Sequence, residues 1–144
     1  MRYAVLFLAV LTFGCTREEG RIRTGKAMQV INALGAPKSA EIIFFGEDGW
    51  SDWAAINEEH RAKLLKLFSE CFVVRVHYNG SLPQFPPANW VVRFKFANEP
   101  ERSVEFLLRR RDTLISVDNC DSADFLDCSE QHEELVELLE LLEK

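Results

Sequence analysis

The sequence predicts an α+β fold, a two-layer sandwich in which one mostly antiparallel sheet has helices packed on one face. Two patterns support this prediction. Apolar and polar residues alternate with a period of two along 90–96 and again along 102–108, as in strands that bury one face. Apolar residues recur at helical spacing along 58–70 and near the end of the chain, so helices are expected before and after these strands.

The expected globular domain covers residues 24–144, and it begins with a helix. Thr24 is a plausible N-cap, and the helix is expected to end at Leu34, before a Gly-Ala-Pro sequence. Residues 39–45 are apolar on both faces, which predicts a strand that is central in the sheet or covered. After a turn at 46–49, residues 50–56 fit either a short strand or a loop, and both alternatives stay open.

A second helix is expected over about 58–70. Asn57 supplies a side-chain acceptor at its N-cap, and two glutamates place negative charge in its first turn. Residues 72–78 are rich in β-branched and aromatic side chains, so they are expected to form the next strand. The loop 79–89 that follows contains three prolines, which exclude regular pairing.

The alternating segments predict a hairpin with a definite register. The pairs on its apolar face are Phe96 with Arg102, Phe94 with Val104, and Val92 with Phe106. The same register sets Arg93 opposite Glu105, so the charge pattern agrees with the apolar pattern. A third strand over 113–117, after a four-residue turn, would place Ile115 opposite Phe106. The final helix is expected to be capped by Asp127 or Ser129.

The first fifteen residues have the layout of a signal peptide. Arg2 supplies a positive charge, 3–13 are almost entirely apolar, and Cys15 ends the segment. This apolar run is shorter than the roughly 20 residues that a membrane-spanning helix needs. The sequence Leu11-Thr12-Phe13-Gly14-Cys15 resembles the lipobox of bacterial lipoproteins, in which an obligatory cysteine follows small or apolar residues.

The resemblance implies that residues 1–14 are removed and that Cys15 is acylated, leaving 15–23 as a polar tether. Thr16 stands where an Asp would retain the protein in the inner membrane. The implied location is therefore the cell envelope, on the periplasmic face of the outer membrane if the host is Gram-negative. Loss of Arg2 would change the net charge from −6 to about −7, which disfavours nucleic-acid binding.

Three cysteines remain once Cys15 is assigned to lipid, and an odd number predicts one disulfide and one spare thiol. Cys120 and Cys128 flank a short acidic loop and are the expected disulfide pair in an exported protein. Cys71 lies in an apolar stretch, so it is expected to be a buried small hydrophobe and not a nucleophile.

Few residue patterns point to a catalytic or metal site. Four aspartates recur every third residue near the expected disulfide, and carboxylates are the ligands that calcium prefers. They are Asp118, Asp121, Asp124 and Asp127. Their spacing does not fit the calcium-loop motif, and a solvated acidic loop is the simpler interpretation. Arg109–Arg111 are interpreted as a solvated turn. No histidine pair with zinc-ligand spacing and no nucleotide-binding or hydrolase motif occurs, so no cofactor is expected and an enzyme is disfavoured.

Aromatic residues are the best candidates for a contact site. Trp50 and Trp53 flank a polar dipeptide, and Phe85 lies in the proline-rich loop. Exposed aromatics often anchor protein or glycan contacts. The competing interpretation is that these side chains fix loops onto the sheet.

The order of elements over 39–142 resembles that of small bacterial lipoproteins of unknown function, including those with a YhfM-like domain, and this resemblance transfers no functional residue. The leading expectation is a non-enzymatic, lipid-anchored envelope protein that binds a protein or glycan. One rival is an inhibitor or immunity lipoprotein that blocks an envelope-active enzyme through the acidic loop or the Phe85 loop. The other is a hydrolase whose site assembles only in three dimensions, for example from His77, Cys71 and a carboxylate.

Overall fold

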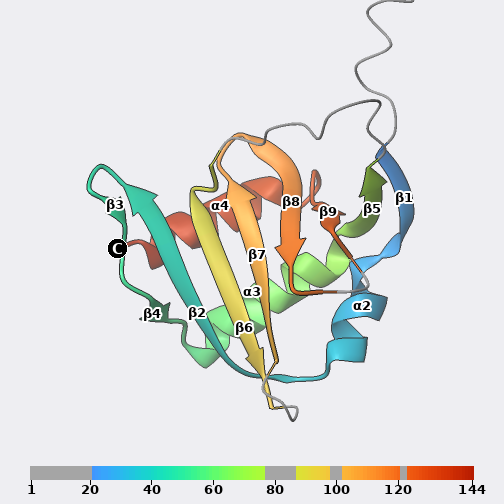
Figure 1. Cartoon of the computed structure of the whole chain (residues 1–144), viewed down its shortest axis with the longest axis horizontal. Helices are drawn as coiled ribbons and strands as arrows, with labels where there is room; N and C mark the ends of the chain where they lie inside the picture. Colours follow the sequence, from blue (N-terminus) through green and yellow to red (C-terminus); the bar gives the residue numbers. More distant parts are fainter. Residues whose placement is uncertain (1–20, 77–86, 98–101, 121–122) are drawn as a thin grey trace, which may run out of the picture.

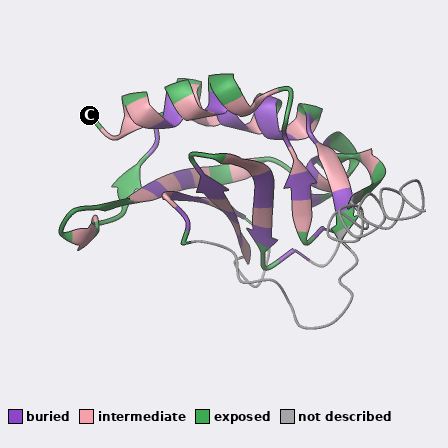
Figure 2. Ribbon diagram, turned by 90° about the horizontal axis from the view of Figure 1, so that it is seen from above, coloured by how far each residue is buried: buried purple, intermediate pink, exposed green. Residues whose placement is uncertain are grey.

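The computed structural model describes residues 21–76, 87–97, 102–120 and 123–144. In this part of the chain, nine strands form one sheet with the order β1-β5-β9-β8-β7-β6-β2-β3, and β4 pairs with β2. All neighbouring strands are antiparallel. Helices form a layer over one face of the sheet (Figures 1 and 2). The predicted two-layer α+β sandwich is confirmed.

The elements have the following bounds. The strands are β1 (Arg21–Lys26), β2 (Pro37–Gly46), β3 (Gly49–Trp50), β4 (Ala54–Ala55), β5 (Phe72–Val76), β6 (Trp90–Phe96), β7 (Arg102–Arg109), β8 (Asp112–Asp118) and β9 (Phe125–Asp127). The helices are α2 (Ala27–Leu34), α3 (Glu58–Glu70) and α4 (His132–Leu142). The expected signal peptide 1–14, Cys15, Phe85 and Asp121 lie outside the described residues.

The hairpin register is confirmed, and the position of the third strand is corrected. Phe96 pairs with Arg102, and Arg93 pairs with Glu105. Phe106, however, lies opposite Val117 and not Ile115. The ladder between β7 and β8 shifts by two residues near Arg109, and because the shift is even, the apolar side chains stay on the same face.

The N-terminal boundary of the domain is also corrected. Residues 21–23 belong to β1 and not to a tether, since β1 pairs with β5 along the edge of the sheet. Thr24 is a strand residue whose hydroxyl donates to the Val73 carbonyl at 3.4 Å, so it does not cap α2. Sequence patterns miss such a strand because an edge position does not require buried side chains. Gly35, with φ 86°, ends α2 as predicted.

The second helix is confirmed and the cap of the last helix is corrected. Asn57 Oδ1 accepts a hydrogen bond from the backbone N–H of His60 at 2.8 Å, and α3 ends at Glu70. α4 begins later than expected, at His132, and has no side-chain cap. Asp127 instead accepts a hydrogen bond from the backbone N–H of Ser129 at 3.0 Å, closing a turn before the helix.

The predicted disulfide between Cys120 and Cys128 is wrong. Cys128 is bonded to Cys71, and Cys120 is a buried free cysteine. The reason is β9, which the sequence patterns missed. β9 pairs with β5 so that Phe72 lies opposite Asp127, which sets the flanking cysteines opposite each other with their Cα atoms 4.7 Å apart. The same strand carries Cys128 away from Cys120 along the β8–β9 hairpin.

Candidate partner-binding surface

Most large apolar side chains of the described chain are buried between the sheet and the helices. Three exposed aromatic residues are exceptions, and they lie between positions 45 and 53 at the β3 edge of the sheet. Phe45 is 50% exposed, Trp50 is 46% exposed and Trp53 is 37% exposed. We call these three residues the aromatic patch.

A tight hairpin builds one half of the aromatic patch. Gly46 pairs with Gly49 across a two-residue turn, and Gly49 has φ 97°, a conformation that favours glycine. Phe45 is therefore opposite Trp50, and their rings meet edge to face with centroids 5.3 Å apart. The Ser51 hydroxyl accepts a hydrogen bond from the backbone N–H of Phe44 at 3.1 Å, which ties the returning chain to β2.

Trp53 forms the other half, and it lies beside a group of charged residues. The Arg93 guanidinium carbon is 3.7 Å from the Trp53 ring centroid. The same guanidinium binds Glu105 at 2.8 Å and approaches Glu41 at 3.7 Å. Lys95 also binds Glu41, at 3.2 Å. We call Glu41, Arg93, Lys95 and Glu105 the charged cluster. Its two glutamates hold the Arg93 guanidinium against the Trp53 ring.

The open question about residues 50–56 is answered by two short strands. β3 and β4 both pair with β2, and Ser51–Trp53 connect them, with the Ser51 N–H still donating to the Phe44 carbonyl at 2.9 Å. The chain therefore turns after β2 and runs back along its outer edge, with Trp50 in β3 and Trp53 in the connection. Both tryptophans remain exposed, while β4 is anchored through Ala54 opposite Ile42.

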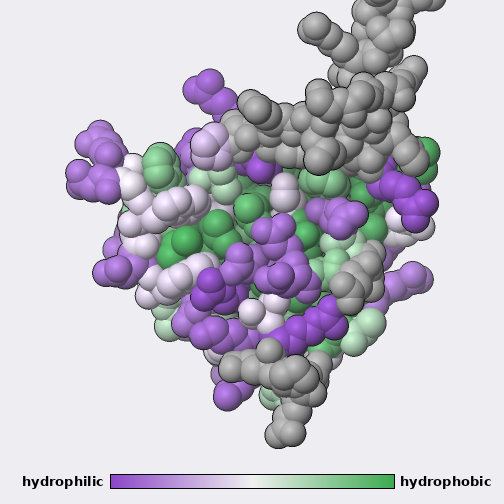
Figure 3. Space-filling model, viewed as in Figure 1, coloured by the Kyte–Doolittle hydropathy of each residue, from purple (hydrophilic) through white to green (hydrophobic). Residues whose placement is uncertain are grey.

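The aromatic patch and the charged cluster lie on the face of the sheet that no helix covers. Glu41 and Phe45 share one face of β2 by strand alternation, and Glu41 is in register with Arg93. Figure 3 views this face and shows hydrophobic residues gathered across its middle, with hydrophilic residues among and around them. Val91 and Leu107, paired across β6 and β7, lie on the same face as Arg93 and Glu105 by strand alternation.

The sequence identified two of the three aromatic residues. Trp50 and Trp53 are both exposed at this edge of the sheet, whereas Phe85 is outside the described residues. Phe45 was missed because it ends an apolar strand segment and looked like part of the core. The signal that would have found it is the Gly-Glu-Asp-Gly turn, since a two-residue turn sets Phe45 opposite Trp50.

Among the described aspartates, Asp127 lies at the other end of the β8–β9 hairpin from Asp118 and Asp124. Asp118 ends β8 and lies opposite Glu105, whereas Asp127 ends β9 and binds Arg23 Nη2 at 3.0 Å. The backbone carbonyl of Asp124 accepts from the N–H of Val117. Asp121 lies outside the described residues. Within the part of the chain that is described, no group of three or more acidic, histidine or cysteine residues is arranged to hold a metal ion.

The Asp127 carboxyl is held in its charged form. Partial burial would raise its pKa, but hydrogen bonds from Ser129 and the ion pair with Arg23 outweigh burial and bring the pKa below its ordinary value of 3.8. Arg23 donates to the same carboxylate oxygen from Nε at 3.1 Å as well. The residue thus fastens β1 to the end of β9.

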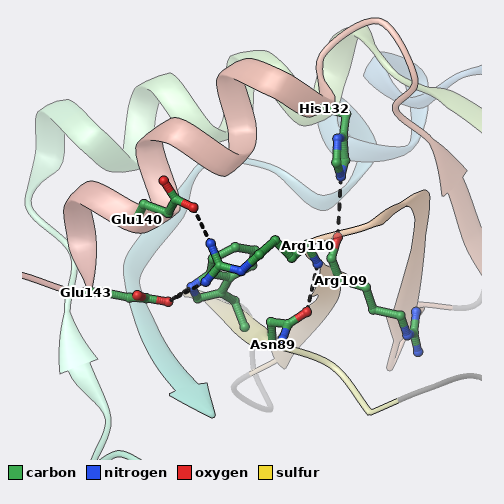
Figure 4. A network of polar contacts seen from close by, with 7 residues as sticks. Asn89, Arg109, Arg110, His132, Glu140 and Glu143 are labelled. Carbon is green, nitrogen blue, oxygen red and sulfur yellow. Dashed lines mark hydrogen bonds and ion pairs between the residues drawn. The ribbon is translucent and has the colours of Figure 1, made fainter. Parts of the chain in front are cut away.

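The predicted arginine turn is structural for two of its three members. Figure 4 shows Arg110 reaching α4, where it binds Glu140 and lies 3.6 Å from Glu143. Its guanidinium also stacks over Trp90 at 4.5 Å, and the Trp90 indole donates to Glu143. Arg109 is 7% exposed and donates to Ser116 at 3.3 Å. This network joins the last helix to the sheet, and only Arg111 matches a solvated turn residue.

The proposed members of a hydrolase site do not assemble in the described residues. Cys71 is bonded to Cys128, so it has no free thiol to act as a nucleophile. His77 lies outside the described residues. His132 contacts the carbonyl of Arg109 at 3.4 Å and belongs to the helix-anchoring network.

No protein-family model, curated protein or solved structure matches this chain. None of the described helices is both long enough and apolar enough to span a membrane.

Proposed function

We propose that this chain is a lipid-anchored lipoprotein of the bacterial envelope, without enzymatic activity, that binds a partner protein through the aromatic patch. The signal-like segment ending at Cys15 supports the anchor. The observation that carries the binding role is the exposure of Phe45, Trp50 and Trp53 together on the helix-free face. Aromatic residues beside paired charges are the usual composition of energetically important protein contacts.

The position of the aromatic patch suits a partner away from the membrane. β1, where the tether would enter, and β3, which carries Trp50, are the two edges of the sheet. Seven inter-strand steps of about 4.8 Å separate these edges, or roughly 34 Å. A lipid at Cys15 would therefore leave the aromatic patch directed into the envelope space.

The arrangement of the rings favours a protein over a glycan. Arg93 covers one face of Trp53, and Phe45 meets Trp50 at an interplanar angle of 67°. The aromatic patch therefore does not present a row of parallel open rings on which sugars would stack. The charged cluster beside it carries both signs of charge, which fits the polar rim of a protein interface. An inhibitor or immunity lipoprotein would be one form of this function, with an envelope-active enzyme as the partner.

The anchor is tested by the mass and location of the protein produced in a bacterium. The wild type is expected to begin at Cys15, to carry added acyl chains and to sediment with membranes. The Cys15→Ala variant is expected to lose the acyl mass and the membrane association. A soluble, unlipidated wild type would overturn the anchor.

The binding role is tested by photo-crosslinking in the same cells. A photoreactive residue at Trp50 or Trp53 is expected to give a discrete protein adduct, whereas one at Glu137, exposed on α4, gives none. Trp50→Ala/Trp53→Ala should abolish the adduct formed by a photoreactive residue at Phe45. Leu141→Ala is a matched control, because Leu141 is 54% exposed but lies outside the aromatic patch. Adducts that disappear after digestion of peptidoglycan would indicate a glycan, and absence of any adduct would contradict the binding role.

A further inference from the structure

The β1 edge of the sheet has a charge opposite to that of the chain as a whole. Between Arg21 and Leu34 the sequence has three cations and no acidic residue, although the whole chain has a net charge of −6. Arg75, exposed on β5, adds a further cation opposite Ile22. Two large apolar side chains are exposed beside these cations, Ile22 at 53% and Met28 at 45%. We call Ile22, Arg23, Lys26, Met28 and Arg75 the basic edge.

The cations of the basic edge are not all neutralised by neighbours. Arg23 binds Asp127 and lies 4.3 Å from the Phe72 ring centroid. Lys26 lies 5.9 Å from the same centroid. Among the described residues, no carboxylate forms an ion pair with Lys26 or Arg75. The basic edge therefore keeps an excess of positive charge, and α2 beside it contributes no charged residue.

The covalent chain places this edge close to the proposed lipid. Arg21 follows Cys15 by six residues, and six extended residues reach at most about 22 Å. The described part of the domain therefore begins, at β1, within that distance of the bilayer. α4 begins shortly after β9, with Glu133 and Glu134 in its first turn, and from there it runs toward the β3 side of the sheet in Figure 1.

We propose that the basic edge rests on the anionic headgroups of phospholipids and so fixes the orientation of the anchored domain. The proposal rests on the lipid anchor of the proposed function. Cations at a membrane surface are attracted by anionic lipids, while exposed apolar side chains such as Ile22 and Met28 enter the interface. Pairing of two copies through β1 is disfavoured, because it would bring their cations together and because β1 has a bulge between Arg23 and Gly25.

The experiment uses the lipidated full protein reconstituted in vesicles of phosphatidylcholine, with or without 30% phosphatidylglycerol (about one anionic lipid in three). A spin label is attached at Met28→Cys, or at Asp48→Cys in the β2–β3 turn, each in a Cys120→Ala background. Flotation first establishes that the protein is held by vesicles of both compositions. Accessibility of each label to a water-soluble and to a lipid-soluble relaxant then reports the orientation.

The label at Met28 is expected to become shielded from water only in the anionic vesicles, while the label at Asp48 stays accessible to water in both. Lys26→Glu/Arg75→Glu should abolish this shielding. Lys38→Glu/Lys66→Glu, which changes the net charge equally at exposed positions of β2 and α3, should retain it. Two results would overturn the proposed orientation and leave the lipid anchor standing. One is equal exposure of the Met28 label in both vesicle types, and the other is shielding of that label that persists in the Lys26→Glu/Arg75→Glu variant. Failure of the wild type to float with neutral vesicles would overturn the anchor and the orientation together.

Discussion

Cys71 and Cys128 are 57 residues apart in sequence, yet they face each other across neighbouring strands and form a disulfide. Cys71 is the C-cap of α3, and Cys128 directly follows β9, shortly before α4. Both cysteines are fully buried. The bond therefore links the end of one covering helix to the segment that leads into the other.

Loss of this disulfide should strongly destabilise the protein. The chain-entropy relation gives about 4 kcal/mol for a loop of this length. Cys71→Ala/Cys128→Ala is expected to lower the free energy of unfolding by roughly 2–5 kcal/mol in denaturant titrations. Cys120→Ala is the control, because Cys120 is buried but unbonded. Peptide mapping without reductant should recover residues 71 and 128 in one linked pair, and a link between 120 and 128 would contradict the structure.

The core should depend on a cluster of three phenylalanines. Phe106 stacks on Phe68 with ring centroids 4.4 Å apart, and it meets Phe94 edge to face at 5.6 Å. Phe106→Ala is expected to cost about 3–5 kcal/mol, because it leaves a cavity between the sheet and α3. Phe45→Ala removes the same atoms from a half-exposed site and should cost less than about 1 kcal/mol. Equal effects of the two substitutions on the denaturation midpoint would contradict the assigned burial.

The Arg23–Asp127 pair predicts a specific pH dependence. Because the folded-state pKa of Asp127 is lowered, its charge stabilises the fold above the unfolded pKa, and this stabilisation is lost as pH falls through the folded pKa. Asp127→Asn should therefore be less stable than wild type near neutral pH, with the difference shrinking below about pH 4. Urea titrations from neutral pH to below this value measure the difference in the free energy of unfolding between the variant and the wild type. Asp48→Asn, at an exposed turn position, is the control, and its difference from the wild type should not shrink as the pH falls.

Arg110 should contribute more to stability than its neighbour Arg111. Arg110 binds Glu140 and covers the Trp90 ring, whereas Arg111 is an exposed turn residue. Arg110→Ala is expected to destabilise the protein by about 1 kcal/mol, since an exposed ion pair and a cation–π contact each contribute up to about that amount. Arg111→Ala should have little effect. Thermal unfolding followed by tryptophan fluorescence compares the stability of the two variants. Similar losses of stability in Arg110→Ala and Arg111→Ala would contradict a stabilising contact between Arg110 and α4.

Local patterns were enough to predict the layers of this protein. Strict alternation over 90–96 and 102–108 determined the register of the hairpin, because a slip by one residue would bury Arg93 and Glu105. Asn57 likewise determined the start of α3, since its side chain satisfies a backbone N–H that the helix itself leaves free.

Only the tertiary structure decided which distant segments meet. β1 lies at the edge of the sheet and β9 has only three residues, and their pairing with β5 depends on backbone hydrogen bonds that leave no periodic signature in the sequence. The disulfide partner of Cys128 followed from the second of these pairings, and the link between β1 and Asp127 followed from both.

The aromatic patch also depends on contacts between strands. The sequence pattern identified two tryptophans, but the β2–β3 turn set Phe45 beside Trp50, and β6 placed Arg93 against Trp53. Sequence spacing reports the face on which a side chain lies, whereas the choice of neighbour across a sheet depends on contacts between residues far apart in the chain.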